Sequence, residues 1–492
     1  MNLAAAFIDC AQEHAGKPAI FWGDHEITYT ELLERAQAVA SRLQNDFGVR
    51  PGDRVALWLK NCPEFVPAVF GILLAGGVVV PVNNFLKSAE VAYIVNDCGA
   101  DVLISGAELN AHGEELCTSR PTLKLLPTEE FTRLVSAPGL SPALRSEKDL
   151  AVIIYTSGTT GRPKGAMLSH GNLLHNVASC REVLAMVEAD RFAVLLPLFH
   201  TYMLTVGVFL PFTSGCSIVL VKSLHPPRNA LAEIFMRQAS ILPAIPQFYR
   251  AMVGAQLPET LPLRVCISGS APLPMQVLRE FEEKFHIPLL EGYGLSEASP
   301  VVSKNPIHGI RKAGSIGLPI PRVEMSVQDE DGKLLGDGEI GEICVRGGNV
   351  MLGYWNQPEA TAKSFRGEWL LTGDVGYRDD DGYYYITDRK KDMLLVNGNN
   401  VYPREIEEVI YQFPGVKEVA VIGVPDARKG EQPVAFVAAL EGSVLNERLL
   451  LEFVRERLAD YKVPRKVVFT AALPRNATGK ILKTELRKQP LS

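Results

Sequence analysis

Tyr155-Thr-Ser-Gly-Thr-Thr-Gly-Arg-Pro-Lys-Gly165 is a loop of small polar residues between two more apolar segments. The run before it, Leu150 to Tyr155, is apolar and rich in β-branched residues, and therefore predicts a buried strand. After the loop, residues 166–169 lead into a helical pattern that opens near Asn172. So many small donors between two such elements indicate a binding loop, with a plain surface connector as the alternative.

The composition of this loop suits a polyphosphate. Glycines permit backbone angles that other residues avoid, so that consecutive N–H groups turn toward one anion. Hydroxyl side chains add donors and a lysine adds positive charge. The ordinary P-loop signature is absent because Arg162 and Pro163 separate Gly161 from Lys164. The donors are Gly158, Gly161, Gly165, Ser157, Thr159, Thr160 and Lys164.

A second candidate for phosphate chemistry lies near the end of the chain, in Pro474-Arg-Asn-Ala-Thr-Gly-Lys-Ile481. If the fold brings Lys480 and the polar loop onto one ligand, the reaction is nucleotide chemistry with Lys480 acting at the reacting phosphorus. From its position alone, Lys480 is better explained as a solvated side chain in a polar tail.

Composition excludes several classes. The chain has 492 residues, a formal net charge of -6 and 22% charged residues, which is typical of a globular protein and disfavours nucleic acid as the main partner. Its eight cysteines form no Cys-x-x-Cys pair, so we expect neither a zinc site nor a disulfide framework, and a cytoplasmic location fits. The N-terminus has no basic segment ahead of its apolar run, and no signal peptide is predicted.

Two uncharged stretches, Phe65 to Val82 and Thr201 to Val221, have the length of membrane spans. Prolines and glycines interrupt both, so each predicts a helix, a turn and a buried strand, with no transmembrane segment. Peripheral membrane contact stays open.

Strand-like runs such as Ile218 to Lys222 and Leu263 to Ser268 alternate with helical patterns, which favours an α/β fold with layered, largely parallel sheets. A polar run of mixed charge follows Ile386, and a compact α+β pattern begins after it. In that pattern Pro403 opens a helix with one apolar face. We therefore expect a large domain over residues 1–388, a hinge at 389–392 and a small mobile domain over 393–492 that carries Lys480.

Five motifs in order make the chain resemble the acyl-adenylate-forming superfamily of acyl-CoA synthetases, adenylation domains and luciferases, and most of all its fatty-acyl-CoA ligases. The loop of residues 155–165 is similar to the phosphate signature of that superfamily. Glu291-Gly-Tyr-Gly-Leu-Ser-Glu297 resembles its adenine and magnesium segment, with Ser296 where threonine is commoner. Residues 372–374, 387–392 and 476–480 resemble its ribose motif, hinge and catalytic loop.

The resemblance implies two steps. A carboxylate attacks the α-phosphorus of ATP to give acyl-AMP and pyrophosphate, and the thiol of coenzyme A then expels AMP. Magnesium and cationic side chains must offset the repulsion between two anions. The superfamily's role for Lys480 is to bridge the carboxylate and the α-phosphate, that of Arg389 to contact ribose or phosphate, and that of Lys391 to be the pivot. After rotation, Gly398 would give the pantetheine arm close access.

The resemblance also assigns the remaining ligand contacts. Magnesium falls to Glu297 and Thr156, the ribose hydroxyls to Asp374, and stacking on adenine to Tyr293. The full set of ATP contacts is Thr156, Ser157, Gly158, Thr159, Thr160, Gly161, Lys164, Gly269, Ser270, Ala271, Pro272, Gly292, Tyr293, Gly294, Ser296, Asp374, Arg389 and Lys480. Without their motifs, Glu297 reads as a surface acid, Asp374 as a turn cap, Tyr293 as core packing and residues 389–391 as a solvated linker.

The acid is predicted from the segment after Phe199. Relatives that activate α-amino acids carry an aspartate at the next position, and this chain has His200, so an amino acid is disfavoured. The apolar run that follows suits an acyl tunnel lined by His200, Tyr202, Met203 and Phe209, although each also fits an ordinary core. We expect a medium- or long-chain fatty acid. The alternatives are an aryl or branched acid, an acyl-carrier protein as acceptor, and a nucleotide-binding protein without catalysis.

Overall fold

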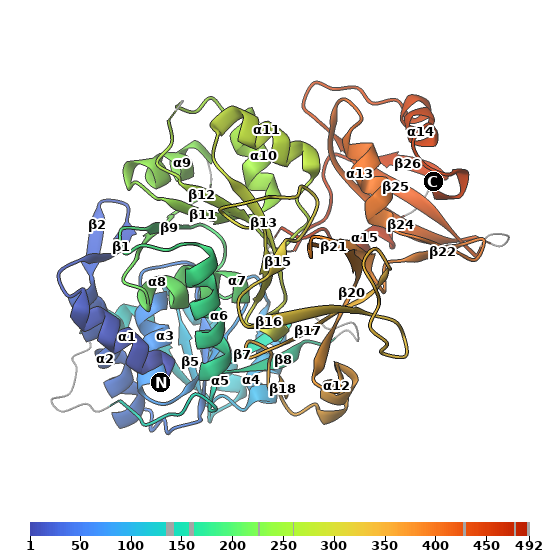
Figure 1. Cartoon of the computed structure of the whole chain (residues 1–492). Helices are drawn as coiled ribbons and strands as arrows, with labels where there is room; N and C mark the ends of the chain where they lie inside the picture. The colour runs from blue at the N-terminus through green and yellow to red at the C-terminus, as the bar shows by residue number, and fades with distance from the viewer. Residues whose placement is uncertain are drawn as a thin grey trace.

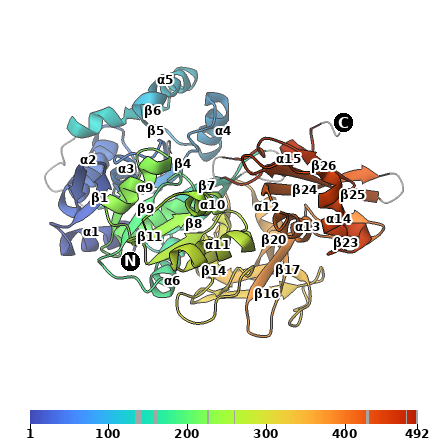
Figure 2. The ribbon, with the colours of Figure 1, turned by 90° about the horizontal axis from the view of Figure 1, so that it is seen from above.

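The computed structural model describes residues 1–133, 142–156, 162–224, 227–258, 260–426, 430–476 and 479–489. Within these residues the chain forms sheets of nine, seven and five strands in a large N-terminal part, and a further five-stranded sheet at the C-terminus. The C-terminal sheet and its helices, orange to red, sit at one side of the larger part in both views (Figures 1 and 2). The predicted α/β class with a smaller α+β C-terminal portion is confirmed.

The seven-stranded sheet carries the polar loop. Its order is β18-β8-β7-β4-β3-β5-β6, parallel from β7 to β6 and antiparallel at the other edge. The strand, the helix and the turn predicted from the sequence here are present, and the helix after the loop begins at His170 with Ser169 as its N-cap. The elements are β3 (Arg54–Trp58), α3 (Phe65–Leu74), β4 (Val78–Pro81), α4 (Ser88–Cys98), β5 (Val102–Ser105), α5 (Asn110–Ser119), β6 (Lys124–Pro127), β7 (Leu150–Thr156), β8 (Lys164–Ser169), α6 (His170–Val183) and β18 (Gly353–Tyr354).

The nine-stranded sheet has the order β15-β14-β13-β12-β11-β9-β10-β1-β2. It is parallel from β13 to β1, and antiparallel at β2, β14 and β15. Helix α6 lies between this sheet and the seven-stranded one (Figure 1). The strands are β1 (Pro18–Trp22), β2 (His25–Thr28), β9 (Arg191–Val194), β10 (Ser217–Leu220), β11 (Ile241–Ala244), β12 (Val265–Ser268), β13 (Leu289–Gly294), β14 (Val301–Lys304) and β15 (Leu318–Pro319).

Most helices of the N-terminal part pack into one continuous apolar core that joins both sheets, whereas α4 and α5 form a separate apolar cluster with the seven-stranded sheet. The segment after Phe199 is a short α-helix that passes through a π-helical turn, η3, before it ends. Among the described residues, none of the helices combines the length and apolarity required to cross a membrane. These helices are α1 (Leu3–Glu13), α2 (Tyr29–Asn45), α7 (Thr201–Leu204), η3 (Thr205–Phe209), α8 (Leu210–Phe212), α9 (Pro227–Met236), α10 (Pro246–Gly254) and α11 (Met275–Phe285).

The third sheet is antiparallel, which limits the predicted parallel character to the first two sheets. Its last strand runs through Arg389, so the first residue of the predicted hinge is part of a strand paired with Asp374. The elements are β16 (Val323–Gln328), β17 (Gly341–Gly347), α12 (Pro358–Lys363), β19 (Phe365–Arg366), β20 (Trp369–Arg378) and β21 (Tyr384–Arg389).

Along the two long strands of the C-terminal sheet, successive apolar side chains point to opposite faces, so both faces are buried. Val419 and Val421 pack under helices α13 and α14, whereas Ala420 and Ile422 pack under Leu473 and the segment that follows it. The apolar cluster of Ala420, Ile422 and Leu473 therefore anchors the segment that carries Lys480. The elements are β22 (Leu394–Val396), β23 (Asn399–Val401), α13 (Pro403–Tyr411), β24 (Val416–Asp426), β25 (Gly430–Ala439), α14 (Glu447–Arg455), β26 (Lys466–Phe469) and α15 (Lys483–Leu486).

Candidate active site

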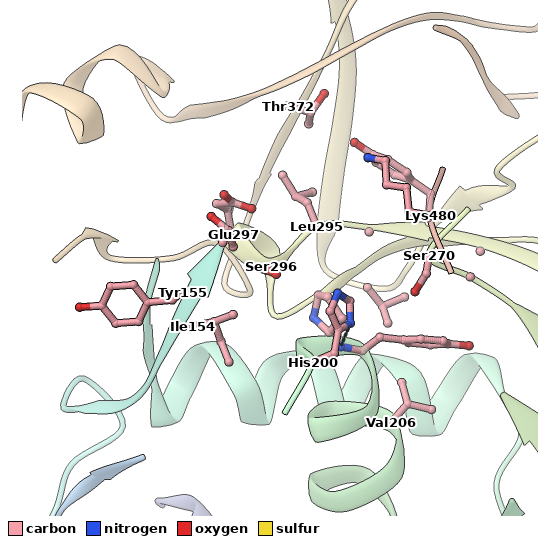
Figure 3. Close-up of a pocket in the computed structure, with 18 of the residues that line it drawn as sticks. Ile154, Tyr155, His200, Val206, Ser270, Leu295, Ser296, Glu297, Thr372 and Lys480 are labelled. Atoms are coloured by element: carbon pink, nitrogen blue, oxygen red, sulfur yellow. Dashed lines mark hydrogen bonds between the residues drawn. The ribbon is translucent and has the colours of Figure 1, made fainter. Parts of the chain in front are cut away.

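A cavity of about 700 Å³ opens where the carboxyl ends of β7, β12 and β13 meet the third sheet and the C-terminal part. Its walls combine residues that are far apart in the sequence: Thr156, His200, Glu297, Arg389 and Lys480. Figure 3 shows Lys480 and Thr372 on one side of this space and His200 and Val206 on another, with Glu297 across from Lys480. The two stretches expected to share a ligand are thus joined by one cavity.

The polar loop contributes its two ends. Thr156 and Lys164 are register partners in β7 and β8, and the Thr156 hydroxyl donates to the Lys164 carbonyl at 3.5 Å. Both residues line the cavity, and the Lys164 ammonium lies 5.2 Å from the centre of the Tyr354 ring. The predicted phosphate contacts between them, namely Ser157, Gly158, Thr159, Thr160 and Gly161, lie outside the described residues.

Gly165 is needed for a reason other than the predicted one. It does not adopt a positive φ; instead, a Cβ at this position would lie 2.7 Å from Cγ2 of Ile153 and 3.2 Å from Cζ of Tyr155. The glycine therefore permits close packing of β8 on its neighbours, and the expectation that it supplies an unusual backbone angle was wrong.

Asp374 is held from both sides. It is 2% exposed; the Tyr293 hydroxyl donates to its Oδ2 at 2.5 Å, and the Arg389 Nε lies 2.8 Å from its Oδ1. Burial, reinforced by Asp374, raises the pKa of Tyr293, so its hydroxyl remains a donor. The carboxylate is thereby fixed in one orientation before any ligand arrives, and its second lone pairs remain for further donors.

Glu297 lies on a single 3-10 turn after β13, and its Oε1 accepts a hydrogen bond from the Tyr354 hydroxyl at 2.8 Å. Within the described ranges, no cluster of three or more acidic, histidine or cysteine side chains forms a metal cage. One carboxylate beside a phosphate loop fits Mg²⁺, which takes one or two carboxylates, substrate phosphate oxygens and water. Its neighbour Ser296 accepts from the Thr201 hydroxyl at 2.8 Å, which ties this turn to α7.

Lys480 is presented by a tight turn. Gly479 has φ +81°, and a Cβ there would overlap Ile245 of the N-terminal part, so only glycine permits this approach. The Lys480 N–H donates to Oδ1 of Asn476 at 2.9 Å, and Arg475 is paired with Glu418 at 2.8 Å. Burial first, and then the nearby Arg389, lowers the pKa of Lys480 to about 8. The amine is therefore directed into the cavity.

His200 lines a different side of the cavity from Lys480. It caps α7 by accepting from the Tyr202 N–H at 3.3 Å on Nδ1. Burial, followed by the charge of Lys480, lowers the pKa of His200 to about 4, so the ring is neutral at physiological pH. His200 therefore presents a neutral polar edge to the cavity beside the cation.

Comparison with known proteins shows the family to which this chain belongs. Residues 7–355 match the model of the family described as AMP-binding enzyme, and residues 405–480 match that of its C-terminal domain. The chain belongs to the AMP-binding enzyme family. The predicted membership in the acyl-adenylate-forming superfamily is thereby confirmed.

Curated relatives of this AMP-binding enzyme cover nearly the whole chain. It is 36% identical over 534 residues to a long-chain-fatty-acid–CoA ligase of Bacillus subtilis (strain 168), an alignment that spans 99% of this chain and 94% of that protein. It is 37% identical over 476 residues to a feruloyl-CoA synthase of an Amycolatopsis species, spanning 96% and 95%. Overall identity therefore does not separate fatty from aryl acids.

The solved structures add information on the arrangement of the two parts. ATP-bound MatB from Rhodopseudomonas palustris superposes with a TM-score of 0.92 at 34% identity, covering 99% of both chains. The apo structure of MatB superposes with a TM-score of 0.81 at the same identity and coverage. Over the whole chain, this AMP-binding enzyme thus superposes better on the ATP-bound structure than on the apo structure.

Other predicted contacts fall into two groups. Gly269, Ser270, Gly292, Gly294 and Lys391 line the cavity, whereas Ala271 and Pro272 do not. Gly398 is exposed, with φ +79°, in the turn between β22 and β23, and is not part of the cavity wall in this arrangement.

Two of the predicted acyl contacts do not line the cavity in this arrangement. Tyr202 lines the cavity, and its hydroxyl donates to the Ile267 carbonyl at 3.3 Å. Met203 and Phe209 are fully buried and absent from the wall, and Phe209 packs edge-on against Phe70. The residue that joins Tyr202 on the cavity side is Val206, four positions later on the same helical face.

The sequence prediction also missed residues of the site. Tyr354 and Lys304 line the cavity, as does Thr372, which the sequence placed in the ribose motif but not among the ligand contacts. Nothing in the sequence near Tyr354 points to Glu297, since β18 is only two residues long. Lys304 did leave a signal, because it ends the apolar run Pro300-Val-Val-Ser that predicts a buried strand, and a lysine there requires an explanation.

Proposed function

We propose that this AMP-binding enzyme is an acid–thiol ligase that activates a medium- or long-chain fatty acid as acyl-AMP and transfers it to coenzyme A, releasing pyrophosphate and AMP. The observation that carries the proposal is that Lys480, Glu297 and the two ends of the polar loop line one cavity. The near-complete coverage of a long-chain-fatty-acid–CoA ligase supports it.

In the first step, ATP binds with its ribose hydroxyls at Asp374 and its β- and γ-phosphates at the loop closed by Thr156 and Lys164. Tyr293 and Arg389 hold Asp374 in place, so little reorganisation is required on binding. Lys480 enters between the incoming carboxylate and the α-phosphate, where negative charge accumulates as the P–O bond forms. Magnesium at Glu297 would neutralise the polyphosphate.

In the second step, the thiol of coenzyme A attacks the acyl carbon and AMP leaves. Lys480 and its loop fill the approach in the present arrangement, with Gly479 pressed on Ile245. The C-terminal part must therefore rotate, and Lys391, exposed between the end of β21 and the start of β22, is the proposed pivot. Rotation would bring Gly398 toward the acyl-AMP.

The acyl side supports a fatty acid. The cavity wall includes the apolar residues Val206, Ile267 and Leu184, and no carboxylate follows Phe199 to pair with an α-ammonium group. The similarity to a feruloyl-CoA synthase keeps an aryl acid as the second candidate. An acyl-carrier protein as acceptor, the cytoplasmic location and contact with a membrane surface stay predictions.

The test is a pyrophosphate-release screen over fatty, aryl and amino acids, with coenzyme A, with an acyl-carrier protein, and with neither. We expect release with fatty acids in the absence of any thiol, and AMP release and thioester only with coenzyme A. Release with aryl acids alone would support the second candidate. No release with any acid would refute the ligase.

A further inference from the structure

Lys304, the last residue of β14, is a buried amine that the two proposed steps do not use. It is 6% exposed and lines the cavity, and its Nζ has no hydrogen-bond partner among the described residues. A buried ammonium without a partner costs several kcal/mol, so such groups are retained mainly where a ligand completes them.

The strand register separates Lys304 from the nucleotide groups. Lys304 is paired with Gly292 across β13 and β14, and Tyr293 is paired with Ser303. Partner residues point to the same face and neighbours to opposite faces. Tyr293 faces Asp374, so Gly292 and Lys304 face away from the ribose site. Because Gly292 has no side chain, the lysine stem passes over its backbone.

The same face carries the apolar part of the cavity. Ile267 is paired with Leu290, two residues before Gly292, and therefore points to the side of Lys304. Cys180 and Leu184, at and just beyond the end of α6, line the cavity as well. Lys304 thus places an amine on the side of β13 that carries these apolar cavity residues.

The surroundings of the amine leave its charge uncompensated. Burial lowers the pKa of Lys304 to about 7; Cys180 opposes this shift and Arg264 adds to it. Arg264 itself is balanced by Asp190, with Nη2 and Nε both 2.7 Å from its oxygens. Asp190 is thereby committed to another cation, and none of the described carboxylates pairs with Lys304.

We propose that the amine of Lys304 binds an oxygen acceptor at the distal end of the acyl substrate, so that the enzyme selects ω-oxygenated fatty acids, above all ω-carboxylates, over plain fatty acids of the same length. This inference rests on the ligase function proposed above and narrows its substrate class. A distal carboxylate restores a charge pair inside the cavity, whereas a methyl end leaves the amine unpartnered.

The experiment compares pyrophosphate release from plain, ω-hydroxy and ω-carboxy acids over a series of chain lengths, with wild-type enzyme and with Lys304→Met. Methionine has a similar length and no charge, and removing an unpaired amine should leave or raise the melting temperature. Ser303→Ala is the matched control, because Ser303 lies on the same strand with its hydroxyl on the Ile316 carbonyl at 2.8 Å, on the opposite face.

At its best length, we expect the wild type to prefer an ω-oxygenated acid by at least about tenfold in kcat/KM, the size of one hydrogen bond to a charged group. Lys304→Met should abolish or invert this ratio, and Ser303→Ala should preserve it. A wild type that uses plain acids equally well or better overturns the inference and leaves the ligase intact. Pyrophosphate release from none of the acids refutes both the ligase function and this inference. The melting temperature is a second readout: we expect it to be higher for the wild type with the ω-carboxy acid than with the plain acid.

Discussion

The two faces of β13 differ in how their polar groups are satisfied. On one face, the Tyr293 hydroxyl is bound to Asp374, which Arg389 holds from its other side. On the other, the backbone of Gly292 lies beside Lys304, whose amine is without a partner among the described residues. Asp374 is therefore oriented before a ligand binds, although Oε2 of Glu291, on the same face as Tyr293, is also without a partner in the described part of the chain; on the opposite face the unpartnered group is the amine of Lys304. According to the proposals above, two ligands of different chemistry bind on opposite faces of a single strand.

Lys480→Ala should disturb the nucleotide side most. ATP–pyrophosphate exchange should fall by roughly 10²–10³-fold, because a cation aimed at the developing charge is removed. The loss should be equal for plain and ω-oxygenated acids, and thioester formation from supplied acyl-AMP should stay nearly unchanged.

Lys488→Ala is the matched control for this change, since Lys488 lies in the same terminal segment, exposed and paired with Glu485 at 2.7 Å. Equal losses in both half-reactions of Lys480→Ala would contradict the role at phosphorus.

Asp374→Asn tests whether the organised face serves ATP alone. Loss of the carboxylate weakens two charge-assisted contacts and leaves the half-buried Arg389 without its ion pair, so KM for ATP should rise roughly 10- to 100-fold. The KM for the acid should change little. Asp379→Asn, farther along the same sheet and paired with Lys312, provides the comparison. A rise in the KM for the acid as large as the rise for ATP would contradict the assignment of ATP and the acid to separate faces of β13.

Lys391→Pro should leave the sites on both faces of β13 unchanged. It should block the rotation that separates adenylation from acyl-CoA formation. Proline fixes φ and restricts the preceding residue, so rotation about this position is impaired. Exchange should persist, while formation of acyl-CoA falls by more than about tenfold. Lys390→Ala, which removes the exposed partner of Glu342, should do neither. If Lys391→Pro catalysed the whole reaction at the wild-type rate, Lys391 would not be the pivot.

The smallest effect is a pH dependence. The pKa of Lys480 is lowered to about 8 by burial and by Arg389 and Lys391, against the opposing charges of Asp374 and Asp392. The cation is the active form, so kcat/KM for ATP should fall as pH rises through about 8, approaching tenfold for each further unit. His200, neutral above about pH 4, contributes nothing in this range. Lys480→Arg should lower the rate but flatten the fall of kcat/KM above about pH 8. If that fall were unchanged in Lys480→Arg, its pH dependence would belong to another group.

The sequence predicted what depends on local order. The strand before the polar loop, the helix opened by Pro403 and the motif residues that reach the cavity all follow from short contiguous patterns. What it could not predict depends on orientation between elements. Met203 is one position from Tyr202 yet points into the core, and the bond between Tyr293 and Asp374 joins residues 81 positions apart. Lys304 gained meaning only when the register placed it beside Gly292.

The most direct measurement is a crystal structure with a non-hydrolysable acyl-adenylate analogue, an ω-carboxyacyl sulfamoyl adenosine. We expect the ribose hydroxyls at Asp374 on one face of β13, the acyl chain past Gly292 on the other, and the distal carboxylate within hydrogen-bond distance of Nζ of Lys304. An acyl chain that leaves the cavity elsewhere, with Lys304 still unpartnered, would contradict the division of the site by this strand.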